Sequence, residues 1–147
     1  MQFTRGMIIV LGGASIGSTI TFQWNPREIR EEGSAKWVPI RAAGCAVPFL
    51  EYTSGNERML RFRLEFSRHH TGAGYVDDML DLLMSLTEPG PGMGGQVMPP
   101  LLKLLFGQKK GTYVMLRCDT HRHTKADPDG LRWQFGSADL TLSEYRV

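Results

Sequence analysis

A glycine-rich segment near the start of the chain, "IIVLGGASIG" at residues 8–17, has the residue types of a phosphate-binding turn. In a nucleotide-binding domain such a turn joins a strand to a helix, and the helix N-terminus holds the phosphates. The spacing of Gly12, Gly13 and Gly17 does not match G-x-G-x-x-G, and the Gly-Lys-Ser/Thr of a P-loop is absent. The next residues, "STITFQWNP", are β-branched and aromatic and predict a strand. We interpret the glycines as a hairpin turn. A small nucleotide-binding enzyme that uses the Gly12–Gly17 turn is the alternative.

A second candidate site is the segment "CDTHRH", where Cys118, His121 and His123 are possible metal ligands. Side chains alternate between the faces of a strand, so Cys118 would point away from both histidines. His69 and His70 are the other histidines of the chain. Because the ligand set is incomplete for a zinc site, we expect no bound metal and no cofactor.

Catalytic residues are not indicated by the remaining polar positions. Ser15 lies in "GGASIG" and not in the G-x-S-x-G turn of a nucleophile elbow. Asp77, Asp78 and Asp81 lie on an expected helix, and we interpret them as its solvated face. We therefore expect no enzymatic activity.

The strand "RMLRFRLEF" carries Arg58, Arg61 and Arg63, which could meet a phosphate. The formal net charge of the chain is only +2, which favours a solvent face or a subunit contact over nucleic-acid binding. A generic β-barrel that binds a ligand or a nucleic acid is a further alternative, since such a module needs clustered aromatic and basic residues.

Composition is that of a globular domain: 147 residues, 41% hydrophobic and 22% charged. This length is enough for one domain with a core but not for two ordinary ones. The longest apolar run, "MIIVL", is far too short for a membrane span and lacks the pattern of a secretion signal. We expect a protein made in the cytoplasm, with Cys45 and Cys118 as free thiols.

Most of the chain has the pattern of short strands. We expect strands at residues 7–11 and 19–24, a strand with alternating faces at 58–67, and a doubly buried strand at "LLKLLFG". The alternation in the strand at 58–67 places Leu60, Phe62, Leu64 and Phe66 on one face and Arg61, Arg63, Glu65 and Ser67 on the other.

A hairpin is expected at the end of the chain, from residues 112–123 and 131–146 around the turn "ADPDGL". We expect Val114, Leu116 and Cys118 to share one face of its first strand. Leu131, Trp133 and Phe135 are expected to share a face of its second strand.

One helix is expected at residues 75–87, with Asp77 and Asp78 near its start, where the helix dipole favours negative charge. Its apolar residues have helical spacing: Val76, Met79, Leu80, Leu83 and Leu86. The segment "EPGPGMGGQVMPP" that follows reads as a loop. The fold class is therefore β-rich α+β.

Residues 27–57 form a long segment in which Pro39 and Pro48 exclude a regular helix and favour an extended or edge arrangement. Its apolar residues are difficult to place in one small core. We expect an extended arm that lies on an adjacent subunit, with these candidate contact residues: Trp37, Val38, Ile40, Val47, Phe49 and Leu50.

Four motifs, in order, resemble those of the tube-type proteins of contractile injection systems (the N-terminal domain family). They are "FQWNPREI", "RMLRFRLEF", "VMPPLLKLLFG" and the closing "DPDGLRWQFGSADLTLSEY". The resemblance covers roughly residues 19–147. It implies a tail-tube-like β-barrel or sandwich with one flanking helix, and members are arranged in a six-fold ring.

The resemblance also implies a structural role, as a baseplate hub or hub–tube adaptor of a contractile-tailed phage or tail-like particle. Its partners would be copies of itself, the hub and spike, and tail tube proteins; DNA would only pass through the channel, and no membrane is involved. We expect a virion protein of the tail baseplate or tube, assembled in the host bacterial cytoplasm. We expect a single domain over 1–147, with the arm at 27–57 and without the C-terminal lysin-motif domain that many members carry.

Overall fold

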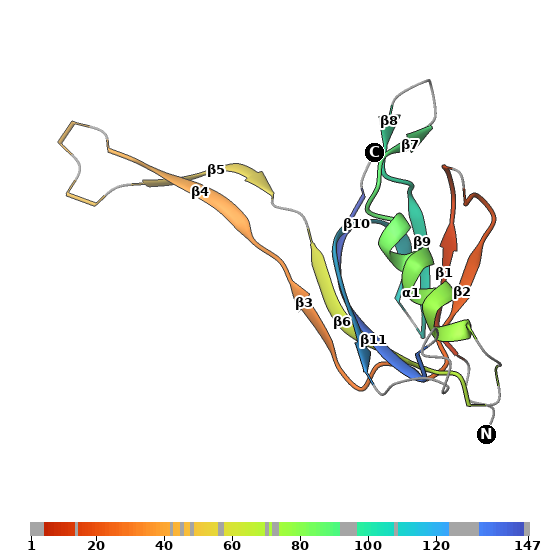
Figure 1. Cartoon of the computed structure of the whole chain (residues 1–147). Coiled ribbons are helices and arrows are strands. Elements are labelled where there is room, and N and C mark those ends of the chain that lie inside the picture. The colour runs from red at the N-terminus through yellow and green to blue at the C-terminus, as the bar shows by residue number, and fades with distance from the viewer. Residues whose placement is uncertain are drawn as a thin grey trace.

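The described residues fold into one large antiparallel sheet, a hairpin that projects from it, a short two-stranded ladder and one α-helix (Figure 1). The computed structural model describes residues 5–13, 15–41, 43–44, 46–47, 49–55, 58–69, 71, 74–91, 97–107, 109–123 and 133–145. Cys45, Pro48, His70 and the turn "ADPDGL" with Leu131 lie outside these residues. The expected β-rich α+β class, with one flanking helix, is confirmed in the described part of the chain.

Seven strands form the large sheet in the order β2-β1-β9-β10-β11-β6-β3, and each neighbouring pair is antiparallel. Their bounds are β1 Met7–Val10, β2 Thr19–Thr21, β3 Ile29–Glu32, β6 Met59–Ser67, β9 Leu102–Phe106, β10 Lys109–His123 and β11 Phe135–Glu144.

Two smaller sheets complete the described strands. β4 (Ala35–Ile40) pairs with β5 (Phe49–Gly55), and β7 (Gly90–Pro91) pairs with β8 (Val97–Met98). The segment expected as a plain loop after the helix therefore contains a short two-stranded ladder.

β10 divides the large sheet into two layers, because it pairs with different strands along its length. Residues 109–113 pair with β9, and residues 113–123 pair with β11. One layer is β2-β1-β9 with the start of β10, and the other is β3-β6-β11 with the rest of β10. The layers curl toward each other, so that Lys109 on β10 reaches Glu31 on β3 at 2.7 Å. The sheet is open: β2 and β3 are not paired with each other in the described residues.

Both layers direct apolar side chains into the space between them. The first layer contributes Ile8, Val10, Ile20, Phe22, Leu102 and Leu104, and the second contributes Leu60, Phe62, Leu64, Phe66, Ala138, Leu140 and Leu142. The expected alternation of β6 is confirmed except at Ser67, which is buried. β9 is a strand as expected, but it is not buried on both faces, because Lys103 is exposed to solvent.

A β-bulge in β10 changes which residues point inward. The register with β11 shifts between Met115 and Arg117. A bulge places an extra residue in one strand, so the alternation of faces reverses across it. Tyr113, Met115 and Cys118 are consequently buried and Leu116 is exposed. The expectation that Val114, Leu116 and Cys118 share one face was therefore wrong.

The second strand of this hairpin also differs from the expectation. Trp133 precedes β11 and packs against the core, whereas Phe135 is exposed at the first position of the strand. The two residues thus do not share a face. Gly136 follows, and a Cβ there would lie 2.7 Å from side-chain atoms of Val76 and Leu80. The helix can approach β11 closely because this residue has no side chain.

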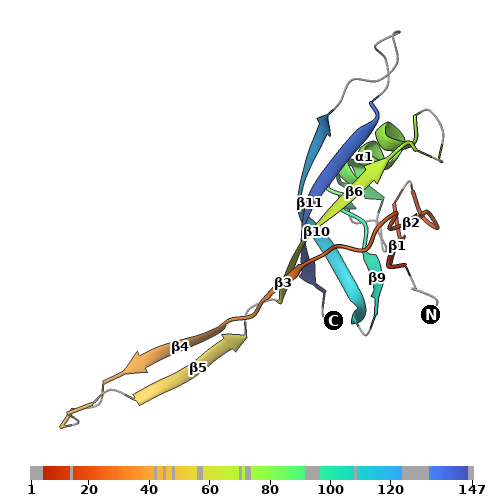
Figure 2. The same ribbon diagram turned by 90° about the horizontal axis from the view of Figure 1, so that it is seen from below.

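The helix α1 (Tyr75–Ser85) lies against β11, β10 and β6 and ends two residues earlier than expected. Figure 2, a view from below, shows it on one side of these strands while the other side stays uncovered. Val76, Leu80, Leu83 and Leu86 are buried, and Met79 is partly buried. The expected packing of the helix on the sheet that contains β6 is therefore confirmed.

We predict that Leu83→Ala lowers the free energy of unfolding by about 2–5 kcal/mol, because it leaves a cavity between helix and sheet. The adjacent Met84 is exposed, so Met84→Ala should change the free energy of unfolding by less than about 0.5 kcal/mol. Urea unfolding followed by circular dichroism measures both. Equal effects of the two substitutions would contradict the packing.

Candidate assembly surfaces

The β4–β5 hairpin is the most unusual surface of the molecule. It projects away from the two layers (Figures 1 and 2), and in the described part of the chain its strands pair only with each other. All six residues of β4 are exposed. The candidate contact residues lie on this hairpin and its turn, and each is exposed: Trp37 54%, Val38 37%, Ile40 44%, Val47 72%, Phe49 64% and Leu50 67%. Within the segment 27–57, Ile29–Glu32 instead pairs with β6 and belongs to the large sheet.

Local contacts explain why the hairpin forms. The Trp37 and Tyr52 rings are cross-strand partners with centroids 5.3 Å apart. The Thr53 hydroxyl donates to the carbonyl of Lys36 at 3.0 Å. Pro39 is tolerated because β4 has a strand partner on one side only in the described residues. A two-stranded ribbon is marginally stable in water, so its order is expected to increase when a partner covers it.

The second surface is the face of β3, β6 and β11 that points away from the helix. Arg61 and Arg63 lie here, as the alternation of β6 predicted. Arg61 is 3.7 Å from Glu32, and Arg63 is 4.0 Å from Asp139. The face carries both signs of charge, and exposed pairs of this kind contribute at most about 1 kcal/mol each.

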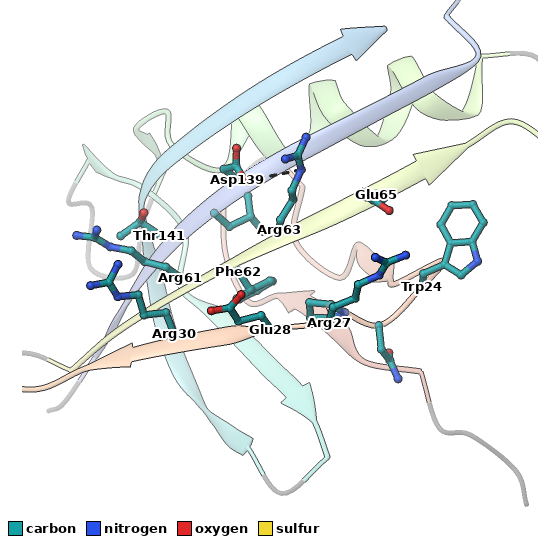
Figure 3. A pocket seen from close by; sticks show the side chains of 13 residues that line it. Trp24, Arg27, Glu28, Arg30, Arg61, Phe62, Arg63, Glu65, Asp139 and Thr141 are labelled. Carbon is teal, nitrogen blue, oxygen red and sulfur yellow. Dashed lines mark ion pairs between the residues drawn. The ribbon is translucent and has the colours of Figure 1, made fainter. Parts of the chain in front are cut away.

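A shallow groove of about 790 Å³ runs along this face toward Trp24, which is half exposed (Figure 3). Its walls combine basic, acidic and aromatic side chains. Among them are Arg27, Arg61, Arg63 and Glu65. The sequence had indicated only the arginines of β6 and not the turn around Trp24 that completes the groove.

Backbone hydrogen bonds at the end of β11 define which strand edges are unpaired. The Glu144 N–H donates to the carbonyl of Arg58, beside β6, and the Tyr145 N–H donates to the carbonyl of Thr112 in β10. The backbone groups of an antiparallel strand alternate between its two neighbours. It follows that Arg117, Asp119, His121 and His123 of β10 direct their backbone groups toward β11.

The intervening residues Cys118, Thr120 and Arg122 therefore direct their N–H and C=O groups away from β11. β9 pairs with β10 only as far as Tyr113, so this part of β10 has no strand partner in the described residues; we call it the β10 edge. By the same alternation, Ile29 and Glu31 direct theirs away from β6, and we call this the β3 edge. The four strands β10, β11, β6 and β3 thus form a layer with an open edge on each side.

The sequence motif "FQWNP" fixes the start of the chain to the sheet. The Gln23 side-chain amide accepts from the Ser67 N–H at 2.8 Å and donates to the Ser67 carbonyl at 3.0 Å. The Asn25 side-chain oxygen accepts from the Gly6 N–H at 2.9 Å. Phe22 is buried against the rings of Phe62 and Phe106. The contacts of Phe22, Gln23 and Asn25 are made with residues distant in sequence. In the sequence, only the motif itself indicated that these residues have a role.

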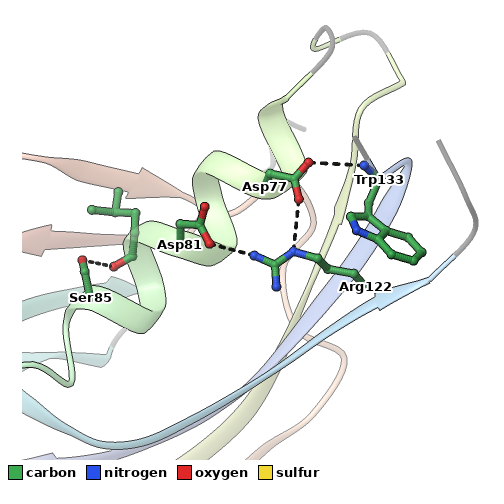
Figure 4. A network of polar contacts seen from close by, with 6 residues as sticks. Asp77, Asp81, Ser85, Arg122 and Trp133 are labelled. Atoms are coloured by element: carbon green, nitrogen blue, oxygen red, sulfur yellow. Dashed lines mark hydrogen bonds and ion pairs between the residues drawn. The ribbon is translucent and has the colours of Figure 1, made fainter. Parts of the chain in front are cut away.

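A second polar network joins the helix to the terminal hairpin (Figure 4). Arg122 pairs with Asp77 at 3.1 Å and with Asp81 at 2.7 Å, and Asp77 also accepts from the Trp133 N–H at 3.2 Å. Asp77 is therefore not simply part of a solvated helix face, as we had interpreted it. Asp81 remains largely exposed.

The glycine segment forms a turn between two antiparallel strands, as expected. β1 pairs with β2, and the Gly17 N–H donates to the carbonyl of Val10 at 2.9 Å. Gly13 and Gly17 have φ angles of 76° and 84°, a region that glycine adopts readily. A strand and not a helix follows the turn, so the helix N-terminus that a phosphate loop needs is missing here.

The segment "CDTHRH" distributes its candidate ligands as the strand alternation predicted. Cys118 is buried, whereas His121 and His123 are exposed on the other face. Burial, helped by the nearby carboxylates of Asp119 and Asp139, raises the pKa of the Cys118 thiol to about 11. This thiol stays protonated at neutral pH, which disfavours metal ligation. The described residues contain no group of three candidate metal ligands.

Among the described residues, no helix is long and apolar enough to cross a membrane. No family model and no curated protein matches the sequence. Among solved structures, the chain is similar to one chain of the virion of a native gene transfer agent particle. The alignment covers 100% of this chain and 96% of that chain, with 12% sequence identity and a TM-score of 0.45. These values are too low to transfer a function.

We predict that Gly17→Ala destabilises the protein by about 1–2 kcal/mol, because a Cβ is strained at its positive φ. Gly12→Ala is the matched control, since Gly12 has no positive φ and a Cβ would contact nothing within 4 Å. Thermal unfolding of the two variants measures the difference.

Thermal unfolding of the unmodified protein with millimolar ATP or NAD should show no stabilisation. A specific rise in Tm would revive the phosphate-loop alternative.

Proposed function

We propose that this chain is a structural, non-enzymatic subunit of a phage-tail-like particle, which assembles with copies of itself into a six-fold ring that joins the central hub and spike to the tail tube. The observation that carries the proposal is the four-stranded layer with two open edges, next to a projecting apolar hairpin. Open strand edges are templates for pairing with another chain. The order of the sequence motifs, which resembles that of tube-type proteins, supports the same role.

Strand directions support edge-to-edge pairing between copies. β10 is antiparallel to β11, β11 to β6, and β6 to β3. With copies related by rotation about a ring axis, the β3 edge of one copy meets the β10 edge of the next in antiparallel orientation. Antiparallel pairing then continues around the ring without interruption. Such a head-to-tail contact closes into a ring when the rotation permits it.

The distribution of mass supports an orientation for the ring. The helix and the β2-β1-β9 layer lie on one side of the β10-β11-β6-β3 layer (Figure 2). In a closed ring the bulky side has more room on the outside. The exposed charged face with Arg61, Arg63 and Asp139 would therefore line the channel, where its mixed charges would let DNA pass without holding it.

A ligand-binding or nucleic-acid-binding module is the second candidate, favoured by the groove beside Trp24 with its arginines. Aromatic and basic groups together can bind single-stranded nucleic acid. Fluorescence anisotropy with single-stranded and double-stranded oligonucleotides at physiological salt tests this candidate. Micromolar binding that is lost in Trp24→Ala would favour it over the structural role.

The ring proposal predicts opposite results for two substitutions of Glu31. Glu31→Pro removes the N–H of the β3 edge, whereas Glu31→Ala keeps it; both lose the ion pair with Lys109. Both variants should fold with similar Tm, because this N–H has no partner within the described chain. Only the proline variant should fail to enter particles purified from the producing cells, with at least about a tenfold loss.

Two results would contradict the proposal. Equal incorporation of the proline and alanine variants would mean that the β3 edge is not an assembly contact. Absence of the unmodified chain from purified particles, measured by mass spectrometry, would exclude the structural role itself.

A further inference from the structure

We propose that the β4–β5 hairpin is held between two further copies of this chain, one on each face of the ribbon. The inference rests on the proposed assembly, which supplies the copies. It goes further in that a single neighbouring subunit would not be sufficient to cover the hairpin.

The register of the hairpin divides its side chains into two faces. Cross-strand partners lie on the same face of a sheet. Trp37 is opposite Tyr52, and Pro39 is opposite Leu50; these four residues form what we call the Trp37 face. Val38 is opposite Glu51, and Ile40 is opposite Phe49; these four residues form the Ile40 face.

Both faces are apolar and both are exposed. Leu50 on the Trp37 face is 67% exposed, and Phe49 on the Ile40 face is 64% exposed. Among the eight residues, Glu51 is the single charged one. A ribbon that lay on one surface would need one apolar face and a polar face toward water. Covering both faces removes these large apolar side chains from water, which is favourable through the hydrophobic effect.

A protein partner fits this ribbon better than a lipid bilayer. Among the described residues, each strand of the hairpin has a strand partner on one side only, so its outer edge presents backbone N–H and C=O groups that no described strand pairs with. Open sheet edges are not tolerated in the hydrocarbon region of a membrane, where water cannot satisfy them. A protein surface can supply both apolar contacts and hydrogen-bonding groups.

The position and length of the hairpin point to copies of this chain. It leaves the large sheet between β3 and β6, beside the β3 edge where the proposed ring places the next copy (Figure 1). β4 has six residues and β5 has seven, so the ribbon is about 20 Å long at about 3.3 Å per residue. A layer of four strands is about 19 Å wide at about 4.8 Å per strand, so the ribbon can extend across the layer of one neighbour toward the copy beyond it.

Photo-cross-linking at two adjacent positions tests the inference. A benzoyl-phenylalanine is placed at Phe49 or at Leu50, which have similar exposure but opposite faces, and at the exposed helix residue Asp78 as a control. Intact producing cells are irradiated, and products are identified by gel mass and peptide mass spectrometry. We expect products of twice the 16.5 kDa chain mass from both hairpin positions, joined to different segments of the partner copy, and little from Asp78.

Three outcomes would overturn the inference: a product from only one hairpin position, products from both positions at the same partner segment, or products with a different protein or with lipid. The ring proposal is tested by a separate result: it fails if the Glu31→Pro variant enters particles as well as the Glu31→Ala variant does. Paired substitutions add a second readout. Trp37→Thr/Leu50→Thr and Ile40→Thr/Phe49→Thr should each leave Tm unchanged and each reduce incorporation at least tenfold, and normal incorporation of either one would exclude a two-sided contact.

Discussion

The bend of β10 is the constraint on which the rest of the structure depends. A single strand pairs with β9 at residues 109–113 and with β11 from residue 113 onward, and the bulge after Met115 lies near the start of the β11-paired region. A bulge bends a strand and increases its local twist, so it separates the sheet into two layers that can face each other. Without the bend, the apolar faces of β6 and β9 would belong to one flat sheet and could not enclose a common core. Among the described residues, the same bend leaves the later part of β10 without a strand partner on the side opposite β11, so the core and the open edge have one cause.

Much of the fold was predictable because its signals are local. The alternation in β6 and the helical spacing of α1 identified both elements and their buried faces. The expectation failed at Leu116, since one extra residue reverses the faces of a strand and apolar character alone does not reveal a bulge. It failed at Phe135 because Trp133 enters the core from outside the strand. The order of strands in the sheet depends on long-range pairing, which periodicity does not encode.

The candidate surfaces were predictable to a different extent. The six candidate contact residues of segment 27–57 are exposed on the hairpin and its turn, whereas Ile29 of the same segment packs against the core. The open edges could not be foreseen, since they depend on which strands end beside which. The same holds for Gln23 and Arg122, whose partners Ser67 and Asp77 are distant in sequence. Polar residues of this kind gain a role only when the backbone brings a buried partner within reach.

The two open edges and the hairpin both present groups that one chain does not cover by itself. At the edges, backbone N–H and C=O groups lack strand partners, and on the hairpin, apolar side chains lack cover. A stable monomer normally protects both, with charges or bulges on its edges and few contiguous apolar residues on its surface. Here the core is already complete, since the helix and the two layers bury their own apolar faces. The unprotected groups are therefore not needed to complete the core of one chain, and in the proposed assembly they are the groups that contacts between chains would cover.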